Sequence, residues 1–444
     1  MRFVADLHIH SKYSRAVSQA MMLPEMEKWA VKKGIDVLSA ADFTHPLWFR
    51  ELKSQLVGSG EGVYELNLKV KSQNSKVKFI LSTEISSIYT QGGRVRRVHN
   101  LIFMPSLESV EKFSNELLKR GANLNADGRP IIGLSSRNLL EIVLSVHPDA
   151  FLIPCHAWTP WFSLYGSNSG FDSITECFQD LSSEINAIET GLSSDPEMNW
   201  RIKELDNRSI VSFSDAHSAV KMAREATVFD MPELSFTNIK NAIKKIGGSK
   251  IAYTIEFYPE EGKYHYTGHR NCHITYSPDE TKEKGVICPV CKRPLTVGVM
   301  HRVNQLADSN LKSQISNLKS DENGVTWVHD PRNIHPPYVK LVPLVEILSE
   351  SLSVMPGSLK VLSKFDEMVS FFGSELNILL SASTLDIEKK FGEKIASAIA
   401  KVRKQDIVVS PGFDGEFGKV KIWKEDEAGA LPGQKPAEEQ MGLF

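Results

Sequence analysis

The chain has 444 residues, of which 41% are hydrophobic and 24% charged, and its formal net charge is −2. This length exceeds what one hydrophobic core usually organises, so we expect two or three domains. No apolar run approaches the length of a membrane span, and the N-terminus lacks the pattern of a signal peptide. These properties exclude a membrane-embedded protein and favour a cytoplasmic one. The near-neutral charge neither indicates nor excludes a nucleic-acid partner.

The first 257 residues alternate short β-prone runs with longer stretches of helical periodicity, which is typical of a parallel α/β domain. Seven of the runs carry residues of the metal-ligand type at or near their ends. These residues are Asp6, His8, His10, Asp42, His45, Glu84, His99, His156, Glu189, Asp215 and His217. Because the carboxyl ends of parallel strands meet at one face of a barrel, the pattern predicts one polar site.

The pair of histidines in "DLHIHS" is the strongest metal signal. Strand alternation places His8 and His10 on one face, and an inward-facing histidine pair is costly without a metal. Asp215 and His217 in "SDAHS" share this spacing. A site with so many such ligands suits two or three divalent ions, and zinc, manganese, magnesium and iron are the candidates. Asp6 and Asp42 can instead orient the ligand histidines.

Five motifs in chain order resemble the PHP (polymerase and histidinol phosphatase) superfamily: "DLHIHS", "DFTH", the strand with Glu84, "PCHAW" and "FSDAHS". The resemblance covers about residues 1–257 and implies a distorted seven-stranded β/α barrel, a trinuclear metal site and phosphoester hydrolysis. The catalytic residues that it implies are Asp215, His8, His10, Glu84 and His156. It gives Glu84 a bridging role with His156, assigns His45 and His217 to the third ion, and leaves His99 as a further ligand. "DFTH" departs from the commoner "DH" of the superfamily.

A second metal site is predicted between residues 258 and 308. Cys272 is followed, after fifteen residues, by the pair Cys288-x-x-Cys291, and His269 has the matching spacing before Cys272. This pattern predicts a structural zinc held by three cysteines and one histidine, with His273 and His265 as alternatives to His269. Three unrelated buried cysteines are the competing interpretation. The surrounding basic and aromatic residues suit nucleic-acid contact, although they equally suit a solvated face.

The remaining chain divides into three predicted parts. Residues 309–336, with "SNLKS" at 309–313 and again at 316–320, are expected to be a polar insertion or linker. Residues 337–424 show helical periodicity and end in "PGFDGEFG", which predicts a tight turn whose backbone another group approaches closely, or a bare hairpin. Residues 425–444 are expected to form a disordered acidic tail.

Several longer motifs resemble the endonuclease Q family of PHP-type DNA repair nucleases, over nearly the whole chain before the tail. They include "ADFTHPLW", "HAWTPWFSLYGSNSGFDS", "GKYHYTGHRNC" and "CPVCKRPLTVGV". The resemblance implies cleavage of DNA on the 5′ side of a deaminated base such as uracil, hypoxanthine or xanthine, after extrusion of that base from the stack. The residues expected to contact DNA are Trp158, Trp161, Phe162, Tyr165, Ser167, Phe171, Arg96 and Arg97.

Two other functions fit parts of the sequence. A small-molecule phosphatase of the PHP type explains the barrel but not the zinc segment, the helical unit or the tail. A degenerate barrel acting as a scaffold is disfavoured by the intact ligand set.

The chain ends in "QMGLF", which resembles the motif that binds the bacterial sliding clamp. Gln440 would supply a polar anchor, while Leu443 and Phe444 would fill an apolar pocket of the clamp. A disordered linker before the motif would give it reach.

Overall fold

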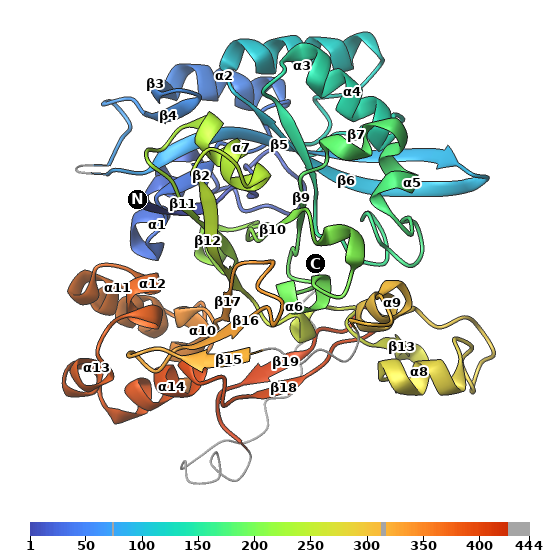
Figure 1. The fold of residues 1–444 in the computed structure, drawn as a ribbon. Helices are drawn as coiled ribbons and strands as arrows, with labels where there is room; N and C mark the ends of the chain where they lie inside the picture. Colours follow the sequence, from blue (N-terminus) through green and yellow to red (C-terminus); the bar gives the residue numbers. More distant parts are fainter. Residues whose placement is uncertain (73–74, 312–316, 425–444) are drawn as a thin grey trace.

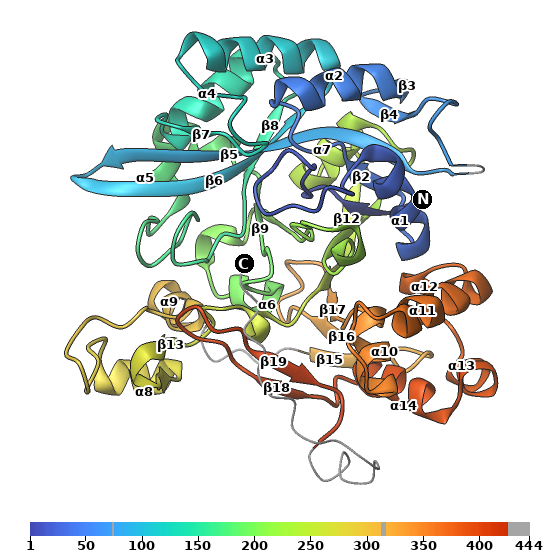
Figure 2. The ribbon, with the colours of Figure 1, turned by 180° about the vertical axis from the view of Figure 1, so that it is seen from behind.

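The computed structural model describes residues 1–72, 75–311 and 317–424. Figures 1 and 2 show a large α/β part that contains the N-terminal half of the chain, with two smaller units beneath it. One of these units carries α8 (Pro278–Lys284) and α9 (Val299–Leu306), and the other is helical. The molecule therefore has a mixed α/β fold with appended C-terminal units.

A large mixed sheet runs through the molecule. Its path contains, in spatial order, β15 (Asn317–Ser320), β16 (Thr326–His329), β17 (Tyr338–Lys340), β12 (Lys250–Glu256), β11 (Ala226–Asp230), β1 (Arg2–Asp6), β2 (Val37–Ser39), β5 (Lys78–Gln91), β4 (Val63–Leu66) and β3 (Leu56–Gly60). β1, β2 and β5 are mutually parallel neighbours, whereas β11 pairs antiparallel with both β1 and β12. The sheet thus continues from the α/β part into the C-terminal half.

The expected all-parallel arrangement is wrong at β6 (Arg94–Met104), which pairs antiparallel with β5 and with β8 (Phe151–Pro154). Gly92 and Gly93 connect β5 to β6, and both have positive φ, at 61° and 71°. Such a two-residue turn reverses the chain at once, so no crossover helix is needed. β7 (Ile131–Ile132) pairs parallel with β5, and β9 (Ala187–Glu189) pairs parallel with β10 (Ser209–Val211).

Amphipathic helices cover the α/β part, as Figure 1 shows for α2, α3 and α4. Their boundaries follow local sequence: α3 begins after Ser106, whose side chain accepts from the backbone N–H of Ser109 in a capping box. The helices of this part are α1 (Leu23–Lys33), α2 (Pro46–Gln55), α3 (Leu107–Lys119), α4 (Ser136–Val146), α5 (Ile174–Phe178), α6 (Pro196–Asn199) and α7 (Phe236–Lys244). Their apolar faces bury a core that includes Trp48, Phe79, Phe113 and Leu139.

The segment 309–336, expected to be a polar insertion or linker, contains two strands of the sheet. β15 pairs with β16 over four residue pairs, and β16 continues onto β17. Val325 and Val328 are buried, and Trp327 packs edge-on against Tyr253 of β12. Alternating apolar residues around "VTWVH" therefore outweigh the polar repeat, and residues 317–320 and 326–329 belong to the sheet.

The predicted helical unit is observed as five helices, which are α10 (Leu344–Leu352), α11 (Leu359–Phe372), α12 (Glu375–Leu380), α13 (Thr384–Phe391) and α14 (Glu393–Arg403). It contacts the α/β part through α1, where the Nζ of Lys33 lies 2.6 Å from the Glu375 carboxylate and both side chains are buried. β18 (Val408–Ser410) and β19 (Lys419–Lys421) follow as an antiparallel pair. Across the described ranges, no helix is both long and apolar enough to cross a membrane.

Candidate metal centre and adjoining cavity

The two histidines that follow β1 are buried and rigidly oriented. His8 places Nδ1 at 2.9 Å and 3.0 Å from the two carboxylate oxygens of Glu189, and His10 places Nδ1 at 3.0 Å from Oδ1 of Asp42. Asp42 also accepts from the backbone N–H and the hydroxyl of Ser11. Because each Nδ1 is engaged by a carboxylate, each Nε2 is turned toward the centre of the site.

Glu84 lies at the middle of β5 and joins the two halves of the site. Its Oε1 is 2.5 Å from Nδ1 of His99 and 3.2 Å from Nε2 of His156. Its Oε2 is 3.5 Å from Nε2 of His10 and 3.8 Å from Nε2 of His8. One carboxylate therefore faces four histidines that come from three separate strands or strand ends.

Asp215 and His217 follow β10 and close the other side. Oδ1 of Asp215 is 2.8 Å from Nε2 of His10 and 3.8 Å from Nε2 of His8. Nδ1 of His217 lies 2.8 Å from the backbone carbonyl of Asp215, and its ring centroid is 4.9 Å from that of His10. The predicted "SDAHS" spacing thus brings both residues to the histidine pair.

These side chains form three overlapping groups whose ligand atoms lie within 4.8 Å of one another: His8, His10 and Glu84; His10, Asp215 and His217; and Glu84, His99 and His156. Nε2 of His8 and Oε2 of Glu84 are buried without a hydrogen-bond partner. Orphaned buried nitrogen and carboxylate oxygen atoms are costly. The donor set therefore fits divalent cations, which supply the missing partners.

The charges inside this cluster shift several pKa values. Burial opposes ionisation of Glu84, but the facing imidazoles outweigh it and hold the pKa of that carboxyl well below its usual range. Burial likewise opposes protonation of His10, yet Asp42 and Asp215 raise its pKa to about 9. Without a cation the cluster is thus a mixture of carboxylates and imidazolium groups, and ions compete with protons for it.

The backbone is strained at three residues of the site. Asp42, His156 and Asp215 have φ angles of 38°, 27° and 46°, in the left-handed region that non-glycine residues rarely adopt. Gly191 packs against His156 so closely that an added Cβ would overlap the Cβ of that histidine. Strain of this kind persists where the surrounding structure enforces it, and it is concentrated at functional sites.

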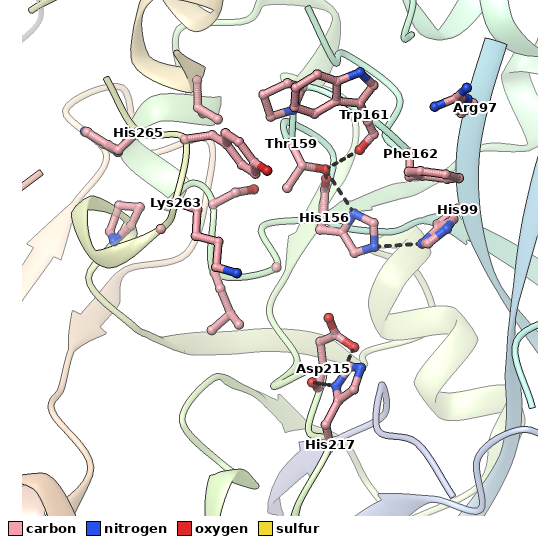
Figure 3. Close-up of a pocket in the computed structure, with 18 of the residues that line it drawn as sticks. Arg97, His99, His156, Thr159, Trp161, Phe162, Asp215, His217, Lys263 and His265 are labelled. Atoms are coloured by element: carbon pink, nitrogen blue, oxygen red, sulfur yellow. Dashed lines mark hydrogen bonds and ion pairs between the residues drawn. The ribbon is translucent and has the colours of Figure 1, made fainter. Parts of the chain in front are cut away.

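A cavity of about 610 Å³ opens over the cluster. His99, His156, Asp215 and His217 form part of its lining, as Figure 3 shows. The opposite wall is formed by Lys263, Tyr264 and His265 from the segment that follows β12. The cavity therefore lies between the α/β part and the cysteine segment, residues 258–308. Its volume is in the range of sites that bury small organic groups.

Three positively charged side chains line the same cavity: Arg97, Arg129 and Lys263. Nε of Arg129 is 3.9 Å from Oε2 of Glu84, and the neighbouring carboxylates raise the pKa of Arg129 although burial opposes this. Arg129 is not among the site residues that the sequence predicts. It lies in the irregular stretch "NADGRP", where no motif or periodicity distinguishes it from a solvated arginine.

His45 is the exception among the predicted ligands. It caps the start of α2, its Nδ1 is 3.5 Å from the backbone nitrogen of Trp48, and its ring stacks on Tyr13 at 4.4 Å between centroids. Among the residues that the structure describes, His45 joins none of the candidate metal groups. Phe43 and Thr44 separate this histidine from Asp42 in "DFTH" and place it at the N-cap of α2.

The five aromatic residues expected to contact DNA divide into two sets. Trp161 and Phe162 line the cavity (Figure 3). Trp158, Tyr165 and Phe171 are instead at most 1% exposed and do not line it, which corrects the prediction. Trp158 stacks on Tyr165, and their polar atoms bond to Asn199 and Glu204, at 2.7 Å and 2.8 Å. These three side chains hold the loop after β8 together.

Arg96 and Ser167 also have structural partners rather than cavity positions. Arg96 is 5% exposed, pairs with Glu176 at 2.9 Å and lies 4.1 Å over the ring of Phe171. The hydroxyl of Ser167 donates to the carbonyl of Val297 at 3.2 Å. Strand alternation in β6 explains the difference: Arg96 points into the protein, and Arg97 points toward the cavity.

The cysteine segment brings its four predicted ligands together. Ligand atoms of His269, Cys272, Cys288 and Cys291 lie within 4.8 Å of one another, and Sγ of Cys291 is 3.4 Å from Nδ1 of His269. β13 (Thr267–His269) and β14 (Ile274–Tyr276) supply the first pair from a short hairpin. His273 and His265 lie outside this group among the described residues. The predicted clamp-binding residues Gln440, Leu443 and Phe444 lie outside the described part of the chain.

Some comparisons with known proteins match part of the chain, and others match nearly all of it. Residues 343–406 match the family described as the MJ0043 C-terminal domain. The Methanocaldococcus jannaschii protein MJ0043 is 32% identical over 272 residues, which are 60% of this chain but only 31% of that relative. The chain therefore spans about a third of the length of this relative. The Bacillus subtilis protein YqxK is 29% identical over 95% of this chain and 99% of its own.

Two solved structures resemble nearly the whole chain. The lesion-specific endonuclease PfuEndoQ from Pyrococcus furiosus is 30% identical, with a TM-score of 0.78 over 97% of this chain and 99% of that one. An endonuclease Q bound to a 27-mer duplex with an abasic lesion at its active site is 31% identical, with a TM-score of 0.80 over 96% and 98%.

The cavity, the clustered histidines and carboxylates, and the fold together define a hydrolase of phosphodiester bonds with a metal-binding site. The two full-length matches make the assignment more specific. The chain belongs to the endonuclease Q family and is a DNA endonuclease.

Proposed function

We propose that this endonuclease cleaves DNA on the 5′ side of a deaminated base such as uracil, hypoxanthine or xanthine. The observation that carries the proposal is the position of the His–carboxylate cluster at the base of a cavity with aromatic and positively charged walls. A phosphodiester and a single extruded base are the two parts of DNA that need such neighbouring environments. Residues 1–257 would form a distorted PHP-type barrel around this site.

The residues that would hold two or three divalent ions are His8, His10, Glu84, His99, His156, Asp215 and His217, and zinc, manganese, magnesium and iron all suit them. When bound, such ions lower the pKa of a water molecule and neutralise charge that develops on a phosphate. Glu189 and Asp42 hold His8 and His10 in the orientation that leaves each Nε2 available. Arg97, Arg129 and Lys263 add positive charge along the cavity, where DNA phosphates would enter.

The cavity walls provide for recognition of a base. Trp161 and Tyr264 lie edge to face with centroids 5.5 Å apart, and Phe162 sits 4.9 Å from the ring of His99. A base extruded from the duplex can pack against such rings, and a deaminated base in a mismatch is cheaper to extrude than a paired one. The hydroxyl of Thr159 points to the same region and donates to the carbonyl of Trp161 at 2.9 Å.

The cysteine segment would bind one structural zinc ion through His269, Cys272, Cys288 and Cys291. Four ligands of this kind complete a tetrahedral site, which leaves no open position for chemistry. The chain between these ligands and β12 carries Lys263, Tyr264 and His265 of the cavity wall. The zinc module would thus hold one wall of the site in place.

A duplex oligonucleotide with one uracil or inosine tests the proposal, in the presence of manganese or magnesium. We expect one cut on the 5′ side of the lesion and none in the matched undamaged duplex. The Asp215→Asn variant should keep the fold and lose cleavage, because the change removes a ligand charge and no core volume. Turnover of a phosphomonoester without any DNA cleavage would instead indicate a small-molecule phosphatase.

We further propose that the terminal "QMGLF" binds the bacterial sliding clamp through Gln440, Leu443 and Phe444. The support is the sequence pattern alone, together with the endonuclease assignment. Deleting residues 440–444 should abolish binding to a purified clamp and leave cleavage of a short oligonucleotide unchanged. Unchanged clamp affinity of the deleted protein would contradict the proposal.

A further inference from the structure

The Gly-rich turn "PGFDGEFG" connects β18 to β19 and is fastened to the chain that forms one cavity wall. Figures 1 and 2 show the loop reaching toward β13 and α9. The backbone N–H groups of Gly412, Gly415 and Gly418 donate to the carbonyls of Glu260, Lys263 and Glu261, at 2.8 Å, 2.9 Å and 3.0 Å. The turn therefore lies against residues 260–263 instead of projecting as a bare hairpin.

Close packing and side-chain bonds make this turn rigid. An added Cβ at Gly412 or Gly418 would overlap backbone atoms, including the carbonyls of Gly262 and Glu260. Asp414 accepts from the backbone N–H of Arg270 at 2.8 Å and from the hydroxyl of Thr296 at 2.6 Å. The turn thus connects residues 260–263 to Arg270 and Thr296, which lie on either side of the three cysteines in the sequence.

Phe417 is an exposed aromatic side chain of this turn. Its side chain is 69% exposed, and the Nζ of Lys263 lies 4.4 Å from its ring centroid. Lys263 itself lines the cavity above the metal-ligand cluster (Figure 3). Phe417 therefore contacts a residue of the cavity lining, and most of its own ring is in solvent.

We propose that Phe417 is a positioning residue that stacks on a nucleobase of the DNA strand entering the cavity, next to the cleaved phosphodiester. The inference rests on the proposed function and specifies how that site holds its substrate. A ring on a rigid turn loses little conformational entropy when a base stacks on it, and its π-face accepts any base. In the part of the chain that the structure describes, Lys263 forms no ion pair with a carboxylate, and its ammonium group is placed to meet the adjoining phosphate.

The position also explains why the turn is built from glycines. The three backbone bonds require the turn to lie against residues 260–263, and larger residues at 412 and 418 would push it away from them. Moving the turn outward would carry Phe417 away from Lys263 and from the cavity. The glycines thus set the height of the aromatic ring above the site.

The Phe417→Leu variant tests the proposal because it keeps an apolar side chain and removes the aromatic face, whereas Phe417→Tyr keeps that face. For a lesion duplex we expect Phe417→Leu to raise Kd about 5- to 150-fold and Phe417→Tyr to bind as wild type does. The matched control is Phe371→Leu on α11, another exposed phenylalanine with a lysine, Lys390, 5.4 Å from its centroid. This control should bind DNA normally.

Fluorescence of 2-aminopurine placed beside the lesion gives a readout that a structural role would not move. Stacking on Phe417 should quench the fluorophore in the wild-type and Phe417→Tyr complexes at saturating protein, and Phe417→Leu should restore its emission. The Lys263→Gln variant should instead lower the salt dependence of binding by about one phosphate contact. Different signatures for the two neighbours would separate stacking from charge.

The outcomes distinguish this inference from the proposed function. If wild type cleaves at the lesion but Phe417→Leu binds and quenches as wild type does, the stacking role is wrong while the lesion-specific activity stands. An equal loss of binding in Phe371→Leu would also overturn it, because the effect would then be general to exposed aromatic residues. If wild type does not cut at a deaminated base, the proposed function fails, and binding to any duplex still tests Phe417.

Discussion

The two candidate metal clusters of this protein use different ligands and meet solvent in different ways. The histidine–carboxylate cluster (His8, His10, Glu84, His99, His156, Asp215 and His217) has more ligand atoms than one ion needs, shares Glu84 between two of its groups, and opens into a cavity. The cysteine cluster offers four ligands, and Cys291 lies at the protein surface while Cys288 is buried. An ion used in chemistry must keep an exchangeable position, whereas an ion that holds a fold is best fully coordinated.

The support around each cluster differs in the same sense. In the histidine–carboxylate cluster, Asp42 and Glu189 fix the ligand histidines, and the backbone is strained at His156 and Asp215. In the cysteine segment, the ligands come from a short hairpin and a Cys-x-x-Cys turn, with little core behind them. The surrounding structure fixes the ligands of the first cluster, whereas we expect a metal in the second cluster to stabilise the fold of its own segment.

Neutralising the shared carboxylate should have the largest effect on activity. In Glu84→Gln, both groups of the histidine–carboxylate cluster that contain Glu84 lose a charge, and cleavage should fall roughly 10²- to 10⁴-fold. Circular dichroism should show a retained fold. Glu141→Gln, which removes an exposed carboxylate paired with Arg137, is the matched control and should cleave normally. Near-normal cleavage by Glu84→Gln would remove the distinction between the clusters.

A smaller loss is expected when only the orientation of a ligand is disturbed. Asp42→Asn weakens the hold on His10 but removes no atom of the groups described above, so metal affinity should fall about 10- to 100-fold. Titrating activity against manganese measures the shift, and excess metal should restore much of the rate. Asp36→Asn, whose carboxylate accepts from the backbone N–H of Val4, serves as the control.

Breaking the cysteine cluster should affect structure before chemistry. We expect Cys288→Ser to lose one equivalent of zinc, and hydrogen exchange to quicken across residues 267–296, because a structural ion contributes folding free energy directly. Cleavage should fall less than in Asp42→Asn, through loosening of the wall that carries Lys263. Full metal content in this variant, or hydrogen exchange that quickens equally across the α/β part, would contradict a structural role confined to the cysteine cluster.

The smallest effect concerns a polar cluster that contains no histidine. Glu225 and Glu256 are fully buried near Thr190, and the hydroxyls of Ser212 and Thr254 donate to Oε1 of Glu256. Burial raises the pKa of Glu256 to about 8, although these hydroxyls lower it. Protons are therefore expected to neutralise these carboxylates, whereas the histidine–carboxylate cluster fits divalent cations.

The pH dependence of stability tests that expectation. A carboxyl with a raised folded-state pKa binds its proton more tightly when folded, so its stabilising contribution is lost as pH rises from about 4.5 to about 8. Glu256→Gln cannot ionise and keeps an acceptor for both hydroxyls. Urea unfolding at both ends of this range should show a loss of stability that is smaller in the variant by about 1 kcal/mol or more. Identical losses in both proteins would show that Glu256 is ionised in the fold.

Much of the site follows from strand-end residues that sequence patterns mark clearly. His8, His10, Asp215 and His217 lie in pairs spaced by two, and the structure brings each pair into the predicted cluster. The aromatic run after His156 was harder to divide, because five rings within fourteen residues give no sign of which face the loop turns outward. The structure buries three of them, and Trp161 and Phe162 alone of the five line the cavity.

Other features depend on contacts between distant segments. Arg129 and Lys263 lie on opposite sides of one cavity although 134 positions separate them in the sequence. Likewise, residues 317–320 resemble part of a linker until β16 supplies their partner strand. A strand at the edge of a sheet has no pattern of its own that identifies its neighbour.

By itself, the sequence determined the ligand types, their pairing along the strands, the four-ligand cysteine segment and the family resemblance, because these depend on short-range spacing. Only the tertiary structure decided that β6 runs antiparallel, that His45 leaves the cluster, and that Arg96 turns inward while Arg97 faces the cavity. It also decided that the Gly-rich turn lies along residues 260–263. These outcomes depend on which surfaces meet when the chain packs, and no local run of residues contains that information.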